Sequence, residues 1–303
     1  MNKQKITIIS NPISGKGESL NAAIKIHKIL KQNGFEVKIK NTSGHGDAKK
    51  LASEAVQDGA ESIIGCGGDG TIHEIINGLS TIHPKHSKPK LGIIPTGRCN
   101  NLAKELKLDN NLNKLSQLII DSQYNAIDLG KVNETLFATV AALGFDSKVA
   151  EYVDKGNHPK FLTGTLSYLY GIFAVLFKFN CPKVSISGDF GSYTGNIFLV
   201  ASGNTPDYGG DFKITPDAKI DDGILNICIV KNISKIKALF LLPRVFFGTH
   251  VKHPKAIYEP SKSLSISSEN TISIWADGEY VGTTPATISI LPKTLKIYST
   301  RYS

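Results

Sequence analysis

Short β-rich runs alternate with helical stretches over the first hundred residues, and this alternation is the feature that most constrains the fold. The β-rich runs are 6–10, 35–39, 62–66 and 91–94, and the helical stretches that follow them are 20–30, 48–56, 72–79 and 102–106. Strands and helices in alternation predict a parallel sheet covered by helices. We expect Gly34 and Gly59 to end helices, and Asp47 and Thr71 to cap helix starts.

After about residue 124 the pattern changes to many short β-type runs, namely 136–142, 184–187, 193–201, 224–230, 271–276 and 286–291. Such runs predict an antiparallel β-sandwich. The chain of 303 residues is also longer than one hydrophobic core usually supports. We therefore predict an α/β domain at 1–125 and a β-sandwich domain at 126–303.

The charge balance favours anionic partners, because 35 Lys and Arg residues face 26 Asp and Glu residues. The sequence lacks the aromatic, Cys/His and basic-arm signatures of nucleic-acid binding, so we expect no nucleic-acid partner. The four cysteines are isolated, which predicts neither a zinc site nor a disulfide framework. The N-terminus lacks the apolar core of a signal peptide, and we expect a cytoplasmic protein.

Two apolar stretches interrupt the second half. Residues 161–177 carry no charge and approach the length that spans a bilayer, but polar residues dilute them, so a buried or interfacial helix is the prediction. Residues 235–247 mix apolar side chains with Lys235, Lys237 and Arg244. That mixture suits an anionic membrane surface, and it equally suits a helix packed on the sandwich.

Three loops rich in glycine and small polar residues follow predicted strands of the first half, at 11–17, 67–71 and 95–101. An open α/β sheet binds ligands at this edge, and exposed amides in such loops suit phosphate. The first loop lacks the spacing of a P-loop, which disfavours a Walker NTPase. The second places Asp69 beside a helix N-terminus, an arrangement suited to holding Mg²⁺ against phosphate oxygens.

Gly67 to Thr71, followed by His73-Glu74 and Asn77-Gly78-Leu79, resembles the nucleotide loop of the diacylglycerol kinase catalytic domain, shared by bacterial lipid kinases, sphingosine kinases and ceramide kinases. The first and third loops resemble other motifs of that family. The second half is similar to the family's C-terminal domain in its motifs at 202–204, 208–210, 212–218, 221–225 and 276–279 with Pro285. The resemblance covers nearly the whole chain, and it implies a Rossmann-like α/β domain, related to NAD kinases and phosphofructokinases, with a C-terminal antiparallel β-sandwich.

The resemblance also implies residue roles. Other branches of the family give the role of general base to the acid at the position of Asp69, whereas bacterial members imply Asp277 and Glu279, and the choice stays open. A structural Mg²⁺ would lie on Asp222 and main-chain oxygens of Lys219 and Ile224, although Asp-Gly here also predicts a hairpin turn. Asp128 and Asp146 stand at recurrent acidic positions. The residues implied to hold ATP are Asn11, Pro12, Ser14, Gly15, Thr42, Gly67, Gly68, Asp69, Gly70, Thr71, His73, Gly97, Arg98 and Asn100.

The third loop departs from the family pattern at two positions. Arg98 stands where relatives usually carry a hydroxyl residue, and Asn101 where many carry Asp. Arg98 either adds a charged contact to phosphate or obstructs it. These departures keep a nucleotide-binding pseudokinase among the alternatives.

The expected activity is that of a lipid kinase that uses ATP and Mg²⁺ at an anionic membrane surface, to which it attaches peripherally. Diacylglycerol, giving phosphatidic acid, is the leading acceptor, and sphingoid bases, ceramide or another lipid alcohol are alternatives. An NAD kinase is the competing member of the superfamily. Bacterial relatives are commonly homodimers, but the sequence leaves the oligomeric state open.

Overall fold

The structure, a computed structural model, describes residues 3–80, 89–108, 110–159, 161–162, 165–207 and 212–300. The chain forms two compact units, Met1–Ile127 with Lys293–Ser303 and Asp128–Pro292. The sequence-based division placed 293–303 in the second domain, whereas the structure groups it with the first unit. The physical reason is Tyr298, which is fully buried in that unit with its hydroxyl 2.8 Å from Ser62 Oγ.

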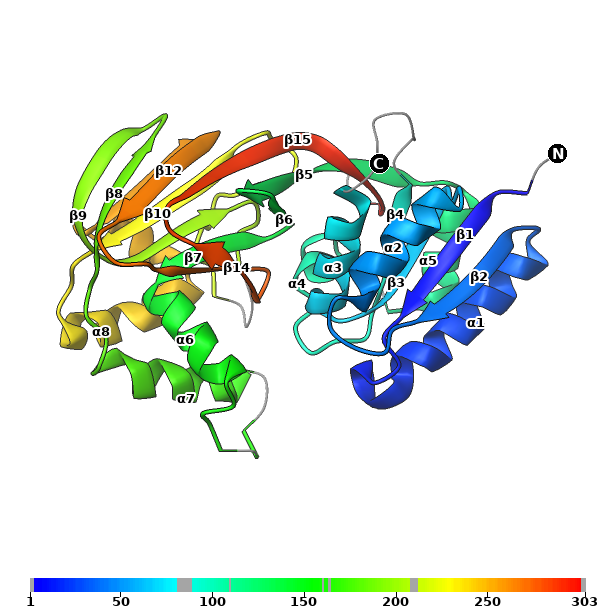
Figure 1. Ribbon diagram of the computed structural model, residues 1–303, viewed down its shortest axis with the longest axis horizontal. Helices are drawn as coiled ribbons and strands as arrows, with labels where there is room; N and C mark the ends of the chain where they lie inside the picture. The colour runs from blue at the N-terminus through cyan, green and yellow to red at the C-terminus, as the bar shows by residue number, and fades with distance from the viewer. Residues whose placement is uncertain are drawn as a thin grey trace. The chain divides into compact units, whose positions relative to one another are not determined.

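The first unit is built on a parallel sheet, as the alternation predicted (Figure 1). Its strand order is β2 (Glu36–Asn41), β1 (Lys5–Ser10), β3 (Ser62–Gly67), β4 (Lys90–Pro95) and the end of β15 (Ala286–Tyr298). The chain moves outward from β1 to β2 and then crosses back to β3 on the other side. The order therefore reverses between β1 and β3, and the loops after these two strands leave the same edge side by side.

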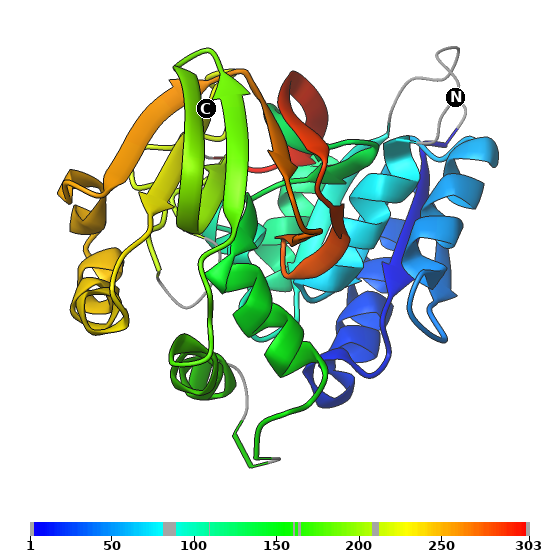
Figure 2. The ribbon, with the colours of Figure 1, turned by 60° about the vertical axis from the view of Figure 1, so that its left-hand side comes forward.

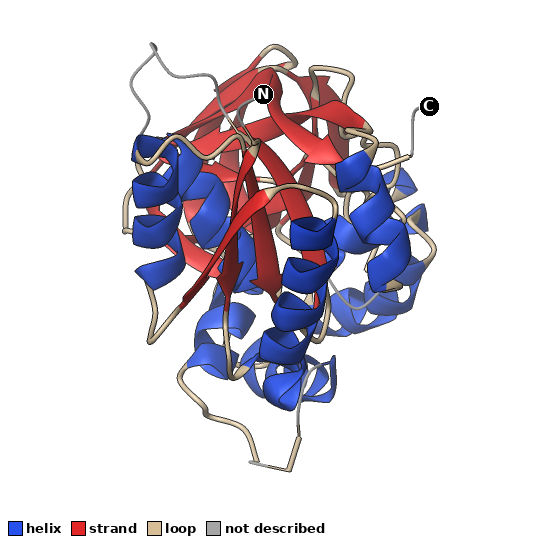
Figure 3. Cartoon of the chain, turned by 90° about the vertical axis from the view of Figure 1, so that its right-hand side faces the viewer, coloured by secondary structure: helices blue, strands red, loops and turns tan. Residues whose placement is uncertain are grey.

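Helices cover both faces of this sheet (Figure 3). One face packs α1 (Glu18–Gln32) and α5 (Leu112–Ile120) onto a core that includes Ile64 and Cys66 of β3. Because side chains alternate along a strand, Gly65 points to the opposite face, where Ile72 and Ile75 of α3 (Asp69–Ser80) lie over it. The helix α2 (Asp47–Gln57) packs against α3.

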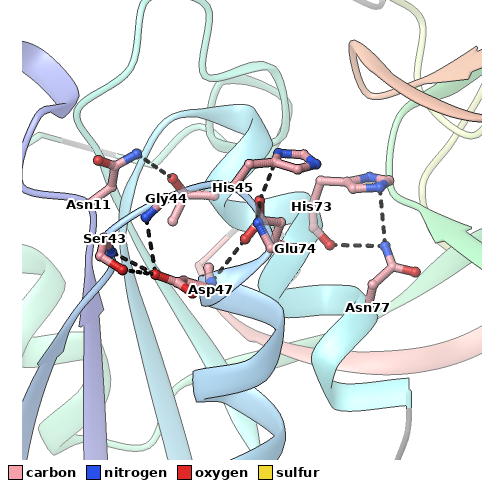
Figure 4. Close-up of polar contacts among 11 residues, drawn as sticks. Asn11, Ser43, Gly44, His45, Asp47, His73, Glu74 and Asn77 are labelled. Carbon is pink, nitrogen blue, oxygen red and sulfur yellow. Dashed lines mark hydrogen bonds and ion pairs between the residues drawn. The ribbon is translucent and has the colours of Figure 1, made fainter.

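The starts of α2 and α3 correct two sequence predictions. Asp47 is the first helical residue of α2 rather than its cap, and its carboxylate accepts hydrogen bonds from the loop before it. Thr71 lies inside α3, which begins two residues earlier. The N-terminus of α2 is satisfied instead by Glu74 of α3, whose carboxylate accepts from Gly46 N at 2.7 Å and Ala48 N at 2.9 Å (Figure 4).

The two helix-ending glycines are confirmed. Gly34 has a φ of +88° and Gly59 a φ of +80°, the left-handed conformation that follows many helices. Each directly follows a helix on the way into the next strand.

The second unit is an antiparallel sandwich, in agreement with the pattern of short runs. One sheet has the order β14 (Glu279–Thr283), β13 (Ser273–Ala276), β7 (Val140–Gly144), β9 (Gly191–Gly203), β10 (Leu225–Lys231) and β11 (Ala256–Ser261). The other contains β12 (Ser263–Ser268), β8 (Lys183–Gly188) and the first half of β9, together with the start of β15. Isoleucine, leucine and valine side chains from both sheets fill the space between them.

The long strand β9 joins the two sheets of this sandwich. Its first half pairs with β8, and its second half pairs with β7 and β10. A strand that changes sheets in this way fixes how the two layers lie over each other.

Three helices cover the outer face of the β7–β9–β10 sheet (Figures 1 and 2). They are α6 (Phe145–Asp154), α7 (Thr165–Leu176) and α8 (Lys235–Phe246), and their buried side chains share a core with that sheet. In the part of the chain that the structure describes, no helix is long and apolar enough to cross a membrane. The remaining elements are η1 (Ser14–Gly17), α4 (Asn101–Glu105), β5 (Tyr124–Val132), β6 (Thr135–Phe137) and η2 (Thr249–Lys252).

The close contact of α2 and α3 generates a stability prediction. A Cβ on Gly78 of α3 would lie 2.4 Å from Lys49 O and 2.8 Å from Ala52 Cβ of α2. Gly→Ala inside a helix normally stabilises by about 1 kcal/mol. We expect Gly78→Ala instead to lower the free energy of unfolding by about 1–3 kcal/mol, because the helices must move apart.

Urea denaturation of the full chain measures this effect. Gly44→Ala is the matched control, because nothing lies within 4 Å of its Cβ position, and it should leave stability nearly unchanged. A stabilised Gly78→Ala protein would contradict the close packing of the two helices.

Candidate functional site

Hydrogen bonds join the first loop of the first unit to the second and third loops. Asn11 follows β1, its main-chain N donates to Cys66 O at 2.9 Å, and its Nδ2 donates to Thr71 Oγ1 at 3.3 Å (Figure 4). Thr96 Oγ1 of the third loop lies 3.2 Å from Ser14 Oγ. The three loops that the sequence singled out therefore meet at one edge of the sheet.

Glycine is required where these loops touch, because their backbones are too close for side chains. A Cβ on Gly97 would lie 2.4 Å from Gly68 Cα, so the second and third loops are in direct backbone contact. Gly15 has a φ of +61°, and its Cβ would lie 2.7 Å from Thr96 O. The site presents main chain and short polar side chains, the surface that suits phosphate.

The carboxylate of Asp69 binds the second loop to the third. Its two oxygens accept hydrogen bonds from Asn100 N at 2.8 Å and Asn101 N at 2.7 Å. These amides open α4, so the negative charge lies at the N-terminus of that short helix, where it is favourable. The sequence placed this carboxylate at the start of its own helix to face metal and phosphate, and the structure adds a positioning role that local sequence does not show.

The other predicted nucleotide residues occupy varied environments. Thr42 directly follows the strand β2, and its N donates to Ser10 O at 2.9 Å. Arg98 is exposed. His73, by contrast, is buried in α3 with its Nε2 3.3 Å from Asn77 Nδ2 (Figure 4). His73 is thus engaged within its own helix.

Asn100 shapes the third loop. Its Oδ1 accepts from Gly97 N at 2.9 Å, and its Nδ2 donates to Gly97 O at 2.8 Å. Asn100 has a φ of +52°, which asparagine tolerates better than most residues. The loop is therefore closed on itself before α4 begins.

In the second unit Asp277 anchors the turn between β13 and β14. Its carboxylate accepts from Ala138 N at 2.9 Å, Thr139 N at 2.8 Å and Thr139 Oγ1 at 2.6 Å, and the residue is 9% exposed. The sequence predicted one strand over 136–142, but the pairing breaks between β6 and β7. That break turns the two amides toward Asp277.

Glu279 begins β14, two residues beyond Asp277, and is half-buried. It pairs with Ala276 across the hairpin. The turn that Asp277 holds therefore also fixes where Glu279 lies. Of the two acids, Asp277 is committed to at least three donors of its own unit.

The region of the predicted metal ligands is rich in carboxylates. Asp128 is fully buried, and its Oδ2 accepts from Gly223 N at 2.6 Å. Asp222 Oδ1 accepts from Ile224 N at 3.1 Å, which makes 221–224 a tight turn. Partial burial raises the pKa of Asp222, and the negative charges of Asp128 and Asp221 add to this, although Asp222 keeps an exposed surface.

This environment fits a hard divalent cation. Crowded carboxylates gain from a positive charge, and oxygen ligands are those that Mg²⁺ takes. Within the described residues no group of three or more His, Cys, Asp or Glu side chains could hold a metal. An ion here would therefore need main-chain oxygens, such as those implied for Lys219 and Ile224. The prediction of a hairpin turn at 221–224 and the prediction of a metal site there are compatible.

Asn204 is a residue whose role sequence reasoning missed. It is fully buried, its N donates to Thr139 O at 2.8 Å, and its Nδ2 donates to Asp128 O at 3.0 Å and Ala138 O at 2.9 Å. It thereby ties the Asp277 turn to the segment that carries Asp128. The sequence signal that could have identified this residue is its position in the Ser202-Gly203-Asn204 motif. Asp146 is half-buried at the second position of α6. The motif at 208–210 lies outside the described residues.

Each of the two units matches the model of a known protein family. The model of the diacylglycerol kinase catalytic domain matches residues 5–132, and that of the YegS C-terminal NAD kinase beta sandwich-like domain matches residues 139–299. The diacylglycerol kinase of Staphylococcus carnosus is 32% identical, covering 98% of this chain and 95% of its own. That of Staphylococcus aureus is 31% identical, covering 98% and 93%. A solved diacylglycerol kinase of Bacillus anthracis superposes with a TM-score of 0.74 at 25% identity, covering 99% and 98%.

The position of Asp69 leads to a prediction about the loops. In Asp69→Asn an NH₂ group replaces one carboxylate oxygen, so a side-chain donor would face a main-chain N–H donor. We expect the free energy of unfolding to fall by about 2 kcal/mol, with faster hydrogen exchange at the amides of Asn100 and Asn101. NMR-detected exchange and urea denaturation measure the two effects.

The control is Asp58→Asn, because the Asp58 carboxylate is mostly exposed and lies 3.7 Å from Lys40 Nζ. Such a surface pair contributes little, so this variant should resemble the parent. Unchanged exchange at both amides in Asp69→Asn would show that the carboxylate does not hold the third loop.

Proposed function

The chain belongs to the diacylglycerol kinase family, and we propose that it transfers the γ-phosphoryl group of ATP, with Mg²⁺, to the hydroxyl of diacylglycerol in a membrane. The observation that carries the proposal is the junction of three glycine-containing loops at the carboxyl edge of the parallel sheet. The names of the Staphylococcus relatives support diacylglycerol over other lipid alcohols as the acceptor.

The proposed reaction is a balanced phosphoryl transfer. The acceptor hydroxyl oxygen forms a bond to the γ-phosphorus, and the bond between that phosphorus and the β,γ-bridging oxygen breaks. ADP leaves with the electron pair of the broken bond. The hydroxyl proton passes to a base, and the products are ADP and phosphatidic acid.

We assign the binding of ATP to the loops of the first unit. Their amides and small polar groups would surround the phosphates, and the rigid backbone contact of Gly68 with Gly97 keeps them in place. Asp69 would act mainly by positioning the third loop, because both of its oxygens accept main-chain hydrogen bonds. Exposed Arg98 could add a charged contact to phosphate.

We assign the general base to Glu279 rather than to Asp277. The Asp277 carboxylate accepts three hydrogen bonds that hold its turn, which gives it a structural role. Glu279 is half-buried at the start of the strand that this turn fixes. Asp277 is then a positioning residue for Glu279.

Mg²⁺ bound with ATP would neutralise charge on the phosphate oxygens during transfer. A second ion is proposed for the turn of Asp222, with main-chain oxygens of Lys219 and Ile224. There it would offset the charge of the buried Asp128 and its neighbours and hold the turn.

A product assay tests the proposed function. Purified protein is incubated with γ-labelled ATP, Mg²⁺ and mixed micelles of diacylglycerol, sphingosine, ceramide or monoacylglycerol, with NAD in a parallel tube. We expect labelled phosphatidic acid. Label in another lipid would reassign the acceptor, NADP would indicate an NAD kinase, and no product in any tube would reject the proposed activity.

The two acids of the second unit should separate in kinetics and stability. We expect Glu279→Gln to lower kcat by about 10²- to 10⁴-fold, because the amide cannot accept the hydroxyl proton. Asp277→Asn should lower the melting temperature as well, because its new amide group opposes a donor. Steady-state kinetics and thermal melting measure both.

Glu269→Gln, at an exposed residue paired with Lys183, is the control and should keep full activity. Full kcat in Glu279→Gln would rule out Glu279 as the base.

The second magnesium site predicts linkage between the ion and stability. Mg²⁺ that binds only the folded chain raises the melting temperature. We expect this rise in the parent protein without ATP, and we expect Asp222→Asn to remove most of it. Differential scanning fluorimetry over a Mg²⁺ titration measures the shift.

Asp121→Asn, an exposed residue of the first unit, should keep the full shift. An equal response of Asp222→Asn and the parent would contradict binding at this turn.

A further inference from the structure

Exposed large hydrophobic side chains gather on two segments of the second unit. Eleven of the fifteen in the described residues lie within 161–177 and 236–247. Single exposed hydrophobic residues are common on protein surfaces, but a concentration of this kind marks an interaction site. These segments include the neighbouring helices α7 and α8 (Figure 2).

Most exposed hydrophobic residues of α7 share one helical face. They are Leu166, Leu169, Tyr170 and Phe173, continued by Phe177 just after the helix, whereas Tyr168 lies off this face. The opposite side of α7 carries Gly171, Ile172 and Leu176, which are buried against the unit's core. The helix therefore has two apolar faces, of which one is covered by protein.

The helix α8 repeats this arrangement. Ile236, Phe240 and Phe247 are 67%, 74% and 78% exposed and lie on one face, while Ala238 and Leu241 are buried on the other. The prediction that this segment packs on the sandwich is confirmed, and α8 also presents apolar residues outward. The start of α8 meets the end of α7, since Lys235 Nζ donates to the carbonyl oxygen of Phe177, the residue that follows α7. Their uncovered faces point away from the same sheet.

The charge of the longer stretches that contain these two segments favours an anionic partner. Between Asp154 and Asp189, and between Asp222 and Glu259, the chain has no acidic residue and ten Lys or Arg residues. The rest of the chain carries 25 basic and 26 acidic residues, so the net charge of +9 arises here. Of these ten, Lys155 pairs with Glu151 and Lys183 with Glu269, Lys235 donates to Phe177 O, and Lys160 lies outside the described residues.

We propose that the outward faces of α7 and α8 form the surface by which this protein docks on an anionic lipid bilayer, with the aromatic residues at the level of the acyl chains and the lysines at the headgroups. Apolar helix faces bordered by basic residues bind membranes in this manner. This docking surface deepens the proposed function, because it names where the enzyme meets the membrane that contains its substrate.

Vesicle sedimentation tests the proposal without ATP or acceptor. The full chain is mixed with vesicles of phosphatidylcholine alone or with one-third phosphatidylglycerol. We expect binding to the anionic vesicles that weakens with salt, and a reduction of about tenfold or more in the partition coefficient for Phe173→Asp and for Phe240→Asp. Ile24→Asp is the control, since Ile24 is 52% exposed on α1 of the other unit, and it should bind like the parent.

A gain of signal provides the second readout. The chain has one tryptophan, Trp275, which is 8% exposed and serves as a constant background. In Phe240→Trp the added fluorescence should shift to the blue with anionic vesicles and be quenched by brominated acyl chains. Ile24→Trp should show neither change.

Three outcomes would overturn the proposal: no binding of the parent to anionic vesicles, equal binding by the Asp variants, or a parent dimer that these variants dissociate while vesicle binding is unchanged. The last result would assign the surface to a second copy of the chain. Kinase activity on dispersed dioctanoylglycerol separates the two proposals. Vesicle binding without phosphorylation would contradict only the proposed function. Phosphorylation without vesicle binding would contradict only the proposed docking surface.

Discussion

The junction of the three loops in the first unit depends on the Asp69 carboxylate, which accepts hydrogen bonds from the two amides that open α4. This contact holds the third loop against the second, where Gly68 and Gly97 meet backbone to backbone. The first loop then joins through Asn11 and Thr71. Three loops that are separate in sequence become one rigid surface, and a surface fixed before binding does not have to be ordered by its ligand.

The second unit uses a carboxylate in a similar way. Asp277 accepts the amides of Ala138 and Thr139, and Asn204 secures the same segment from its other side. In both units an acid within a motif acts on the backbone of a distant segment. Such an acid can be indispensable to activity without touching a substrate, which is why the kinetic and stability effects of Asp277 and Glu279 must be separated.

Much of the fold could be predicted from the sequence because its signals are local. The alternating runs gave the parallel sheet, and Gly34 and Gly59 marked helix ends that the structure confirms. The cap prediction for Asp47 was wrong, because Glu74 reaches the start of α2 from a neighbouring helix and no local pattern reports that contact. The prediction for Thr71 was wrong because α3 begins two residues earlier. The strand predicted over 136–142 is interrupted for the same kind of reason, since its amides are taken by Asp277.

By itself the sequence determined the fold class, the positions of the three glycine-containing loops and the family, because periodicity and motifs are properties of the chain order. Only the tertiary structure decided what each motif residue binds. It gave Asp69 the amides of α4, buried His73 beside Asn77, and left one apolar face of α7 and of α8 uncovered. Hydrogen-bond partners and burial depend on segments far apart in the chain, and their meeting is decided by packing rather than by local pattern.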